Sequence, residues 1–326
     1  MDIKNINWLR LAKDNVAVLV VILLFIISIA MSDAFLTTQN IFNLLRQLAP
    51  PTLIALGMFF VIMTGGVDLS VGSVVAMSAV FTAHFMNADT GLGMGLVPSI
   101  SLVLLIAAVF GFVTGYFVAV RRLAPFVVTL AGMTIARGIA FIVSRGMPIR
   151  ITHTGFNSFA TANIFGVPTM VWFVGVVVLV LALVQRYTVF GRFVQAAGSN
   201  ETATKLSGIN TNFYKIGVFM MSAMLSAMAG IMVASRIRAG TPLAGMYWEL
   251  DAIAAVVIGG ASLAGGTGKV LHTLMGVWVL GLIGNIMDLR NIAAYPQQVL
   301  QGVIIILAIL LQTDRKGKDI SSSSKA

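Results

Sequence analysis

Ten apolar stretches divide this chain of 326 residues, and they constrain its fold more than any other feature. A helix needs about 20 mostly apolar residues to cross the roughly 30 Å hydrocarbon core of a bilayer. Several stretches approach that length, whereas the second, third and eighth are shorter. The stretches are 16–31, 51–64, 71–86, 97–120, 124–144, 167–185, 212–235, 250–264, 270–287 and 298–312. The pattern predicts an all-α, polytopic membrane protein with about ten transmembrane helices, some short or discontinuous.

The composition excludes several other classes of protein. Hydrophobic residues make up 58% of the chain and charged residues 10%, whereas soluble globular chains average roughly 45–50% and about 25%. The absence of cysteine excludes a disulfide framework and cysteine-ligated zinc. The segment GGTGKV, residues 265–270, lacks the first glycine and the final Ser or Thr of a phosphate-binding loop. We therefore expect no enzymatic activity, no cofactor and no ATPase site in this chain.

The excess of basic residues fits a membrane topology. The net charge is +10, from 21 Lys and Arg against 11 Asp and Glu, and cytoplasmic loops of membrane proteins collect such residues. We expect no nucleic-acid partner. If the amino terminus is inside and ten spans alternate, Arg137 falls within a span and fourteen basic residues lie inside. The remaining six, which lie outside, are Arg46, Arg145, Arg150, Arg236, Arg238 and Arg290. This distribution predicts that both termini are cytoplasmic.

The two ends of the chain are interpreted separately from the spans. A basic head before an apolar run also resembles a secretory signal, but its cleavage would leave nine spans and place the basic tail outside. Residues 1–312 are predicted to form a single transmembrane domain. Residues 313–326 are polar, with a run of four serines, and are predicted to be a disordered cytoplasmic tail.

Acidic residues and glycines interrupt the apolar pattern at two corresponding places. In GGVDLSVGS, residues 65–73, two glycines precede Asp68 and Ser70. These two side chains would cap the following helix, or line or gate a membrane pathway, and the two roles are compatible. In residues 248–266, acids including Asp251 precede another short span that ends in glycines. One segment is inside and the other outside, so spans 2–5 and 7–10 are predicted to form an inverted repeat.

Arg137 is the one basic residue within a predicted span. A charge at the centre of a bilayer costs about 2.5–3.5 kcal/mol on insertion scales. Its side chain must therefore face the protein interior or a wet cavity, and its partner would be Asp68 or Asp251. Both a structural ion pair and a direct substrate contact are compatible with the sequence. Asp68, Ser70, Arg137 and Asp251 are thus the candidate residues of a translocation pathway or gate.

The predicted inside loop 187–209 has the composition of folded structure. Asn200 is predicted to cap a short helix with Glu201 in its first turn, because Asn accepts hydrogen bonds from free helical N–H groups. That helix has an apolar side with nowhere in the chain to be buried. A partner protein on the cytoplasmic face would cover it, and the alternative is a helix lying on lipid.

Three motifs carry a resemblance to a known family. The segments GGVDLSVGS (65–73), GRFVQAAGSNETATKLSGIN (191–210) and ELDAIAAVVIGGASLAGGTG (249–268) resemble the ribose-type family of ABC sugar-transporter permeases. Their order and spacing match, and the resemblance extends from about Val16 to Gln312. The resemblance implies a bacterial inner-membrane permease in which two copies, or one copy and a paralogue, pair. It also implies ABC ATP-binding subunits, which would bind the ATP, and a periplasmic sugar-binding protein.

The resemblance further implies that the loop around 191–209 docks on the ATPase. The docking residues would be Gly191, Arg192, Gly198, Asn200, Glu201, Leu206 and Gly208. The chain departs from the family pattern at 195–197, where Gln-Ala-Ala replaces an aromatic and a branched residue. Asn43, Arg46 and Gln47, before the second predicted span, would meet the binding protein.

The sequence therefore favours a subunit of an ATP-driven importer of a pentose, a hexose or a related small polar solute. The alternative is a stand-alone secondary transporter or channel for such a solute. The few charged residues within the spans give little support to ion coupling. The identity of the sugar is not encoded in any motif that we can interpret.

Overall fold

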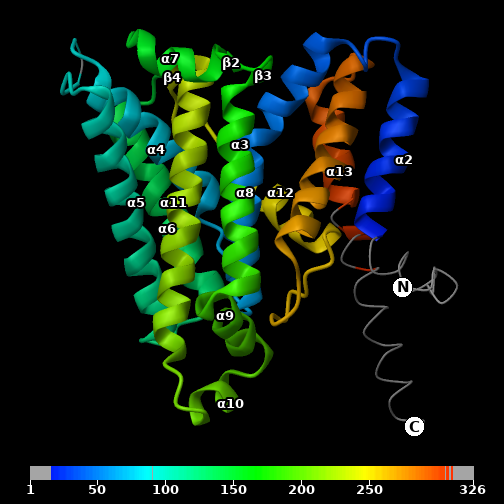
Figure 1. Ribbon diagram of the computed structural model, residues 1–326. Helices are drawn as coiled ribbons and strands as arrows, with labels where there is room; N and C mark the ends of the chain where they lie inside the picture. The colour runs from blue at the N-terminus through cyan, green and yellow to red at the C-terminus, as the bar shows by residue number, and fades with distance from the viewer. Residues whose placement is uncertain (1–15, 90, 305, 308–309, 311–326) are drawn as a thin grey trace, which may run out of the picture.

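The computed structural model describes residues 16–89, 91–304, 306–307 and 310, and this part of the chain is mostly helical (Figure 1). Long helices run side by side, with α7 and the strands at one end of the molecule and α9 and α10 at the other. The helices are α2 (Val16–Met31), α3 (Thr38–Met63), α4 (Val71–Met86), α5 (Leu96–Ala119), α6 (Pro125–Ser144), α7 (Thr154–Thr161), α8 (Thr169–Tyr187), α9 (Val189–Ser199), α10 (Glu201–Leu206), α11 (Thr211–Ile237), α12 (Trp248–Ile258) and α13 (Val270–Leu289). Strand β1 (Ile149–Arg150) pairs antiparallel with β4 (Ala239–Gly240), and β2 (Asn163–Ile164) with β3 (Val167–Pro168). A further helix begins at Ala294.

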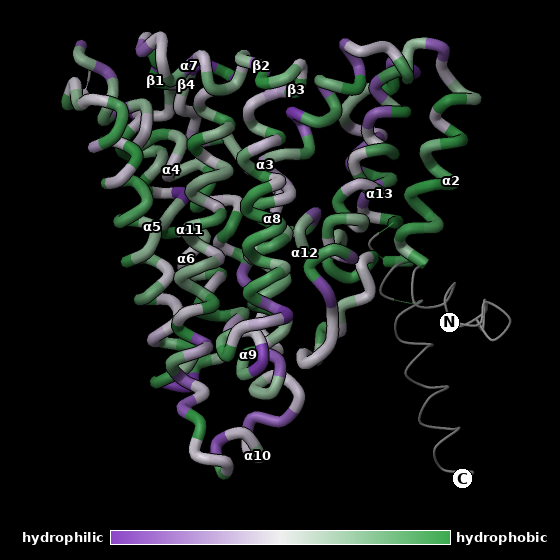
Figure 2. Tube along the Cα trace, in the orientation of Figure 1, coloured by the Kyte–Doolittle hydropathy of each residue, from purple (hydrophilic) through white to green (hydrophobic). Residues whose placement is uncertain are grey.

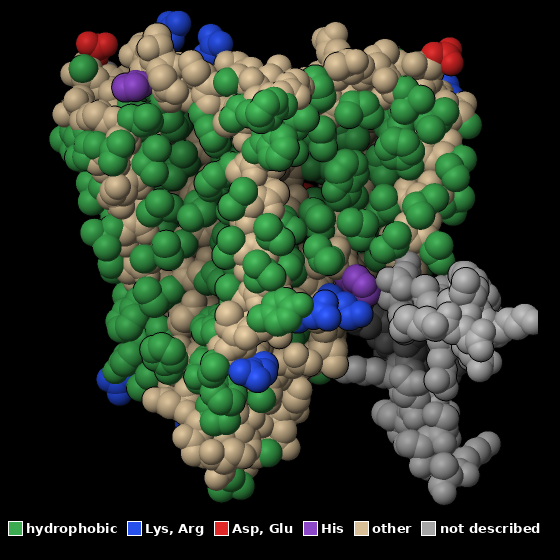
Figure 3. Space-filling model, in the orientation of Figure 1, with side chains coloured by type: hydrophobic (Ala, Val, Ile, Leu, Met, Phe, Trp, Pro, Cys, Tyr) green, Lys and Arg blue, Asp and Glu red, His purple; other side chains and the backbone are tan. Residues whose placement is uncertain are grey.

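The surface and the helix lengths are those of a polytopic membrane protein. In the described part of the chain, six helices are long and apolar enough to cross a membrane, namely α3, α5, α6, α8, α11 and α13. Helices α2 and α4 are apolar but have 16 residues each. Hydrophobic residues occupy the middle of the molecule, and the Lys and Arg side chains on the visible face lie toward its two ends (Figures 2 and 3). The helical membrane fold is confirmed, whereas the number of ten spans stays a prediction.

Two long helices form the centre of the bundle. In their most apolar windows, 78% of the α3 residues and 61% of the α11 residues are buried, against 22% in each of α5, α6 and α8. A helix that is apolar on every side is buried or faces lipid. Helices α5, α6 and α8 therefore turn much of their surface to lipid, while α3 and α11 carry the core.

Small residues allow α5 and α11 to pack closely. A Cβ atom at Gly111 would lie 2.6 Å from the carbonyl oxygen of Phe219, and one at Gly115 would lie 2.8 Å from the Cα of Ile216. Glycines four residues apart on one helix face permit such backbone approach, which is a principal source of packing energy between helices in lipid. The same device joins α3 to α11, where Gly57 lies against Ser222.

The structure corrects the predicted bounds of three spans. The stretch 51–64 is only the second half of α3, which begins at Thr38 and contains Pro50 and Pro51 in its interior. Its first turns fall outside the predicted span because polar residues such as Asn43, Arg46 and Gln47 interrupt their apolar residues. The stretch 250–264 is helical only to Ile258. The last stretch, 298–312, belongs to a helix that already begins at Ala294, and its end lies outside the described residues, as does the predicted tail 313–326.

Two short helices begin deep inside the molecule. Residues 64–70 are non-helical and connect α3 to α4, and residues 238–247 connect α11 to α12. The two helix starts meet, because Gly72 at the beginning of α4 packs against the backbone of Gly245 and the side chain of Glu249. Gly245 has a φ of +65°, a conformation that glycine adopts without steric cost.

The two short helices leave this meeting point in opposite directions. Helix α4 runs toward the α7 end, where Asn87 just beyond it donates a hydrogen bond to the carbonyl oxygen of Arg150. Helix α12 runs the other way, and Gly259 at its end packs against the backbone of His272 near the start of α13. Opposite directions of the two short helices are compatible with an inverted repeat of spans 2–5 and 7–10, which stays a prediction.

Candidate translocation site

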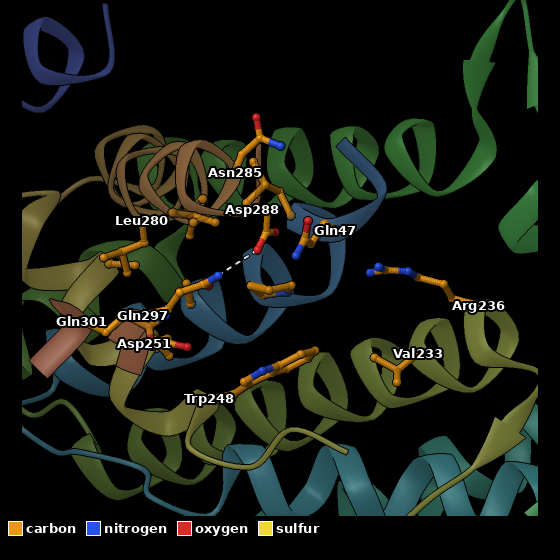
Figure 4. Close-up of a pocket in the computed structure, with 18 of the residues that line it drawn as sticks. Gln47, Val233, Arg236, Trp248, Asp251, Leu280, Asn285, Asp288, Gln297 and Gln301 are labelled. Atoms are coloured by element: carbon orange, nitrogen blue, oxygen red, sulfur yellow. Dashed lines mark hydrogen bonds between the residues drawn. The ribbon is translucent and has the colours of Figure 1, made fainter. Parts of the chain in front are cut away.

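A cavity of about 430 Å³, lined by both polar and apolar side chains, lies between α3, α11, α12, α13 and the helix that follows Ala294. Its size is within the range of about 300–1,000 Å³ that is typical of small-molecule sites. Figure 4 shows the side chains that line it. The polar and aromatic lining residues are Gln47, Arg236, Trp248, Asp251, Asn285, Asp288, Gln297 and Gln301. Polar groups inside a membrane domain commonly mark a substrate pathway.

The cavity opens toward the α7 end and is closed on the side that faces the α9–α10 end. Gln47, Arg236 and Asp288 are exposed, whereas Ala255 and Val277 are buried in an apolar cluster that closes the other side. Asp288 lies eleven residue steps after Val277 on α13, which corresponds to about 16 Å along the helix axis. The cavity thus extends to about half the depth of a bilayer core of roughly 30 Å.

The cavity lining is held by a few hydrogen bonds. Gln297 donates from Nε2 to Oδ1 of Asp288 at 2.8 Å and to the carbonyl oxygen of Ile292 (Figure 4). Asn285 and Asn40 exchange side-chain hydrogen bonds of 3.0 and 3.2 Å, which connect α13 to the first turn of α3. The polar groups of the cavity are therefore fixed by neighbouring helices rather than freely mobile.

Asp251 is the one predicted pathway residue that lines this cavity. Asp68, Ser70 and Arg137 lie elsewhere in the fold and hold the backbone near the two deep helix starts. Sequence reasoning missed the other polar lining residues. Val277, Gly281, Gly284 and Asp288 all line the cavity and follow one face of α13. In the sequence, this spacing of three and four residues is the pattern that indicates a shared helix face.

Asp68 is fully enclosed and hydrogen-bonded by two serines. Its Oδ1 accepts from Ser70 N at 3.0 Å and from Ser70 Oγ at 2.5 Å, and its Oδ2 accepts from Ser222 Oγ at 2.8 Å. Ser222 is the twelfth residue of α11. Its partner Asp68 therefore lies beside α11 at about 16 Å from the start of that helix. The sequence placed Asp68 in a loop at the inner membrane surface, whereas the structure places it deep in the bundle. The predicted helix cap by Ser70 is wrong, because its side chain makes no capping hydrogen bond.

Arg137 holds the connection that precedes α12. Its Nη1 donates to the carbonyl oxygens of Pro242 and Ala244, at 2.6 and 2.8 Å. Among the described residues no ion pair joins Arg137 to Asp68 or Asp251, so the predicted pairing with these acids is wrong. The sequence offered acids at those positions but could not show that backbone carbonyls would take the guanidinium.

The loop between α8 and α11 folds into α9 and α10 at one end of the molecule (Figure 1). The predicted cap is confirmed, because Asn200 Oδ1 accepts from Ala203 N at 2.9 Å. Glu201 follows in the first turn and contacts Lys205 at 2.6 Å and Lys215 at 2.5 Å. Partial burial acts to raise the pKa of Glu201, but the hydrogen bonds and charges of the two lysines lower it to about 2.

The predicted docking residues divide into buried and exposed groups. Gly191 and Gly198 face inward, and a Cβ atom there would overlap the carbonyl oxygens of Gln185 and Met63 respectively. Glu201 is half-buried against its lysines. The exposed residues are Arg192, Asn200, Leu206 and Gly208.

Asn43, Arg46 and Gln47 lie within α3 rather than in a loop before it. Gln47 lines the cavity. Arg46 donates from Nη2 to Oδ1 of Asn163 at 3.0 Å and thereby ties α3 to the β2–β3 hairpin. Asn43 is exposed near the same end of the molecule.

The fold and the cavity together define a polytopic membrane protein with a cavity that opens at one end. Comparison with known proteins makes the class specific. Residues 40–309 match the family model described as branched-chain amino acid transport system / permease component, and the chain belongs to this family of transport permeases.

Individual relatives cover nearly the whole chain. The chain is 38% identical over 313 residues to the ribose import permease protein of Escherichia coli K12, which covers 95% of each chain. It is 40% identical over 299 residues to that of Bacillus subtilis 168, covering 90% of each. It is 36% identical over 298 residues to the L-arabinose transport system permease protein of Escherichia coli K12, covering 91% of this chain and 90% of the relative. No solved structure matches the chain. The resemblance inferred from the three motifs is confirmed.

Proposed function

We propose that this chain is the membrane-spanning permease subunit of an ATP-driven ABC importer that moves a sugar across a bacterial inner membrane. The main support for this proposal is sequence similarity to permeases of ribose and L-arabinose systems. The similarity covers at least 90% of this chain and of each relative. The cavity supports this function because its polar lining residues would receive a small hydrophilic solute from the open end. The chain itself binds no ATP in this proposal.

The orientation follows from the partners that the two ends would meet. The α7 end, where the cavity opens, would face the periplasm and receive sugar from a soluble binding protein. Asn43 and Arg46 are proposed contacts of that protein. The α9–α10 end would face the cytoplasm, as would both termini. Two copies of the chain, or one copy and a paralogue, would form the complete membrane domain.

The α9–α10 end carries an apolar surface suited to an ATP-binding subunit. Leu206 is 84% exposed, and Phe213 and Val189 are also exposed, in a region that lies beyond the apolar band of the helices (Figure 2). Apolar side chains exposed beyond the membrane-spanning part of a protein commonly mark a protein interface. A bound ATPase would bury them, and movement of α9 would reach the core through the contact of Gly198 with Met63.

The buried polar residues have proposed roles in gating. Asp68 and Ser70 hold residues 64–70 against α11, and Arg137 holds residues 242–244. Both segments precede a helix that begins inside the bundle, and transporters place their moving parts at such breaks. A change between outward-facing and inward-facing states would displace these two segments relative to the cavity floor.

Reconstitution tests the proposed function directly. The chain is assembled in vesicles with the ATP-binding and binding proteins encoded beside it, and uptake of radiolabelled D-ribose, L-arabinose and D-glucose is measured with and without ATP. We expect uptake of at least one sugar that requires ATP, the ATPase and the binding protein. Uptake by this chain alone, without ATP, would instead establish the alternative of a stand-alone transporter or channel.

A further inference from the structure

We propose that the cavity is a binding site for one neutral monosaccharide, with the ring of Trp248 as its platform. This inference rests on the proposed function and adds a substrate contact within the membrane domain. The permease would then recognise its substrate rather than provide only an unselective passage.

The arrangement of the lining carries the proposal. Trp248 extends from α12 and forms one wall, and its ring is seen edge-on, so that one face is turned to the interior (Figure 4). The C–H groups of a sugar ring carry partial positive charge and are attracted to the negative face of an aromatic ring. A pyranose or furanose would therefore lie against this wall.

Hydrogen-bonding groups face Trp248 from the other helices. Gln47 comes from α3, Asp288 from α13 and Gln297 from the last helix, whereas the Asn285 amide points away from Trp248 and is hydrogen-bonded to Asn40 (Figure 4). Amide and carboxyl side chains together offer both donors and acceptors, which suits the hydroxyl groups around a sugar ring.

The charges favour a neutral sugar over an anionic one. Two carboxyl groups, those of Asp251 and Asp288, line the cavity with one guanidinium, that of Arg236. A phosphorylated or carboxylated sugar would meet the two acids as well as the arginine, and such like-charge contacts disfavour binding. A free amino acid would bring a carboxylate into the cavity, and that carboxylate would meet the same two acids.

The four tryptophans of the chain permit a direct binding test. In nanodiscs, a variant that keeps only Trp248 is compared with a matched variant that keeps only Trp278, which lines a separate apolar hollow. We expect D-ribose, L-arabinose or D-glucose to change the fluorescence of Trp248 with millimolar affinity, because a transported solute must also leave its site. Trp278 should not respond, and L-leucine should be inert at both positions.

Saturation-transfer NMR on the wild-type chain repeats the test without substitutions. A response of Trp248 to L-leucine but to no sugar would overturn the proposal in favour of an amino acid site. Absence of any sugar response in both measurements, while the assembled complex still takes up sugar with ATP, would overturn this inference and leave the proposed function intact. Failure of ATP-dependent uptake for every sugar would instead count against the proposed function.

Transport kinetics supply an independent readout in the assembled complex. Trp248→Leu should raise the sugar concentration for half-maximal uptake about three- to tenfold, since an aromatic contact is lost. Trp248→Phe should restore most of the affinity because it keeps a ring. Equal loss with Leu and Phe, or no loss with either, would show that the ring is not the sugar platform.

Discussion

Asp68 Oδ2 accepts a hydrogen bond of 2.8 Å from Ser222 Oγ, a residue 154 positions later in the chain. The bond joins the non-helical segment 64–70 to the middle of α11, and both side chains are buried. No basic side chain within the described residues forms an ion pair with Asp68, so hydroxyl and amide donors alone satisfy it. The position of α4 thus depends on Ser222, a residue for which no sequence motif predicts a role.

Replacing Ser222 with alanine should destabilise the fold by about 1 kcal/mol, because a buried carboxyl oxygen loses its donor. The matched control is Ser226→Ala, one turn further along α11. Ser226 is equally buried, but its Oγ has no hydrogen-bond partner among the described residues. Thermal unfolding in nanodiscs should show a lower midpoint for Ser222→Ala only. Equal midpoints would mean that the Asp68 contact adds nothing to stability.

Removal of the Arg137 side chain should loosen the segment before α12. In Arg137→Leu the carbonyl oxygens of Pro242 and Ala244 lose their donor. We expect faster hydrogen–deuterium exchange in 239–247 and slower ATP-driven uptake in the assembled complex. The control Arg145→Asn also removes a guanidinium, and asparagine tolerates the φ of +51° at that position. Similar exchange in both variants would contradict the proposed role of Arg137.

Sequence reasoning recovered the helices wherever hydrophobicity alone decides their existence. Long apolar stretches such as 97–120 and 124–144 match α5 and α6 closely, because any such stretch must be helical in lipid. It failed at the start of α3, where Thr38 and the following polar residues are helical because they pack beside the cavity and α13. Tertiary contacts, rather than local pattern, set that boundary.

The candidate site was predicted only in part for a related reason. Charge drew attention to Asp251, which does line the cavity, and to Asp68 and Arg137, which do not. Neutral amides such as Asn285 carry no such signal, and their role depends on which face of α13 turns inward. That face is decided by packing against α3 and α12, contacts that a single sequence does not contain.

Substitution of Gly198 should impair the coupling between α9 and the core. In Gly198→Ala the new methyl group would overlap the carbonyl oxygen of Met63, which also accepts a hydrogen bond of 3.0 Å from Gly266 N. The overlap should cost about 1–3 kcal/mol and reduce ATP-driven uptake. The control Gly138→Ala adds a methyl group where nothing lies within 4 Å. If Gly198→Ala keeps the wild-type unfolding midpoint, α9 does not pack on Met63 as described.

Leu206 offers the most direct test of ATPase docking. Because the Leu206 side chain is 84% exposed, Leu206→Asp should change the free energy of unfolding by less than about 0.5 kcal/mol. It should nevertheless abolish association with the ATP-binding subunit in a pull-down. Leu92→Asp changes a leucine that is 61% exposed in the α4–α5 connection, at the α7 end of the molecule, and should leave association intact. Wild-type association of Leu206→Asp would move the docking contact away from α10.

Glu201 should report the integrity of the α10–α11 contact through its titration. Lys215 and Lys205 hold its pKa at about 2, below the usual 4.5. A depressed folded-state pKa means that this contact stabilises the fold fully above about pH 4.5, and that the stabilisation is lost as the pH falls toward 2. The chain contains two glutamates, Glu201 and Glu249, so ¹³C-glutamate labelling gives two carboxyl signals, and Glu201→Gln assigns them. Lys215→Met should move the midpoint of the Glu201 signal upward, toward 4.5. A midpoint near 4.5 already in the wild-type chain would show that the lysines do not hold Glu201.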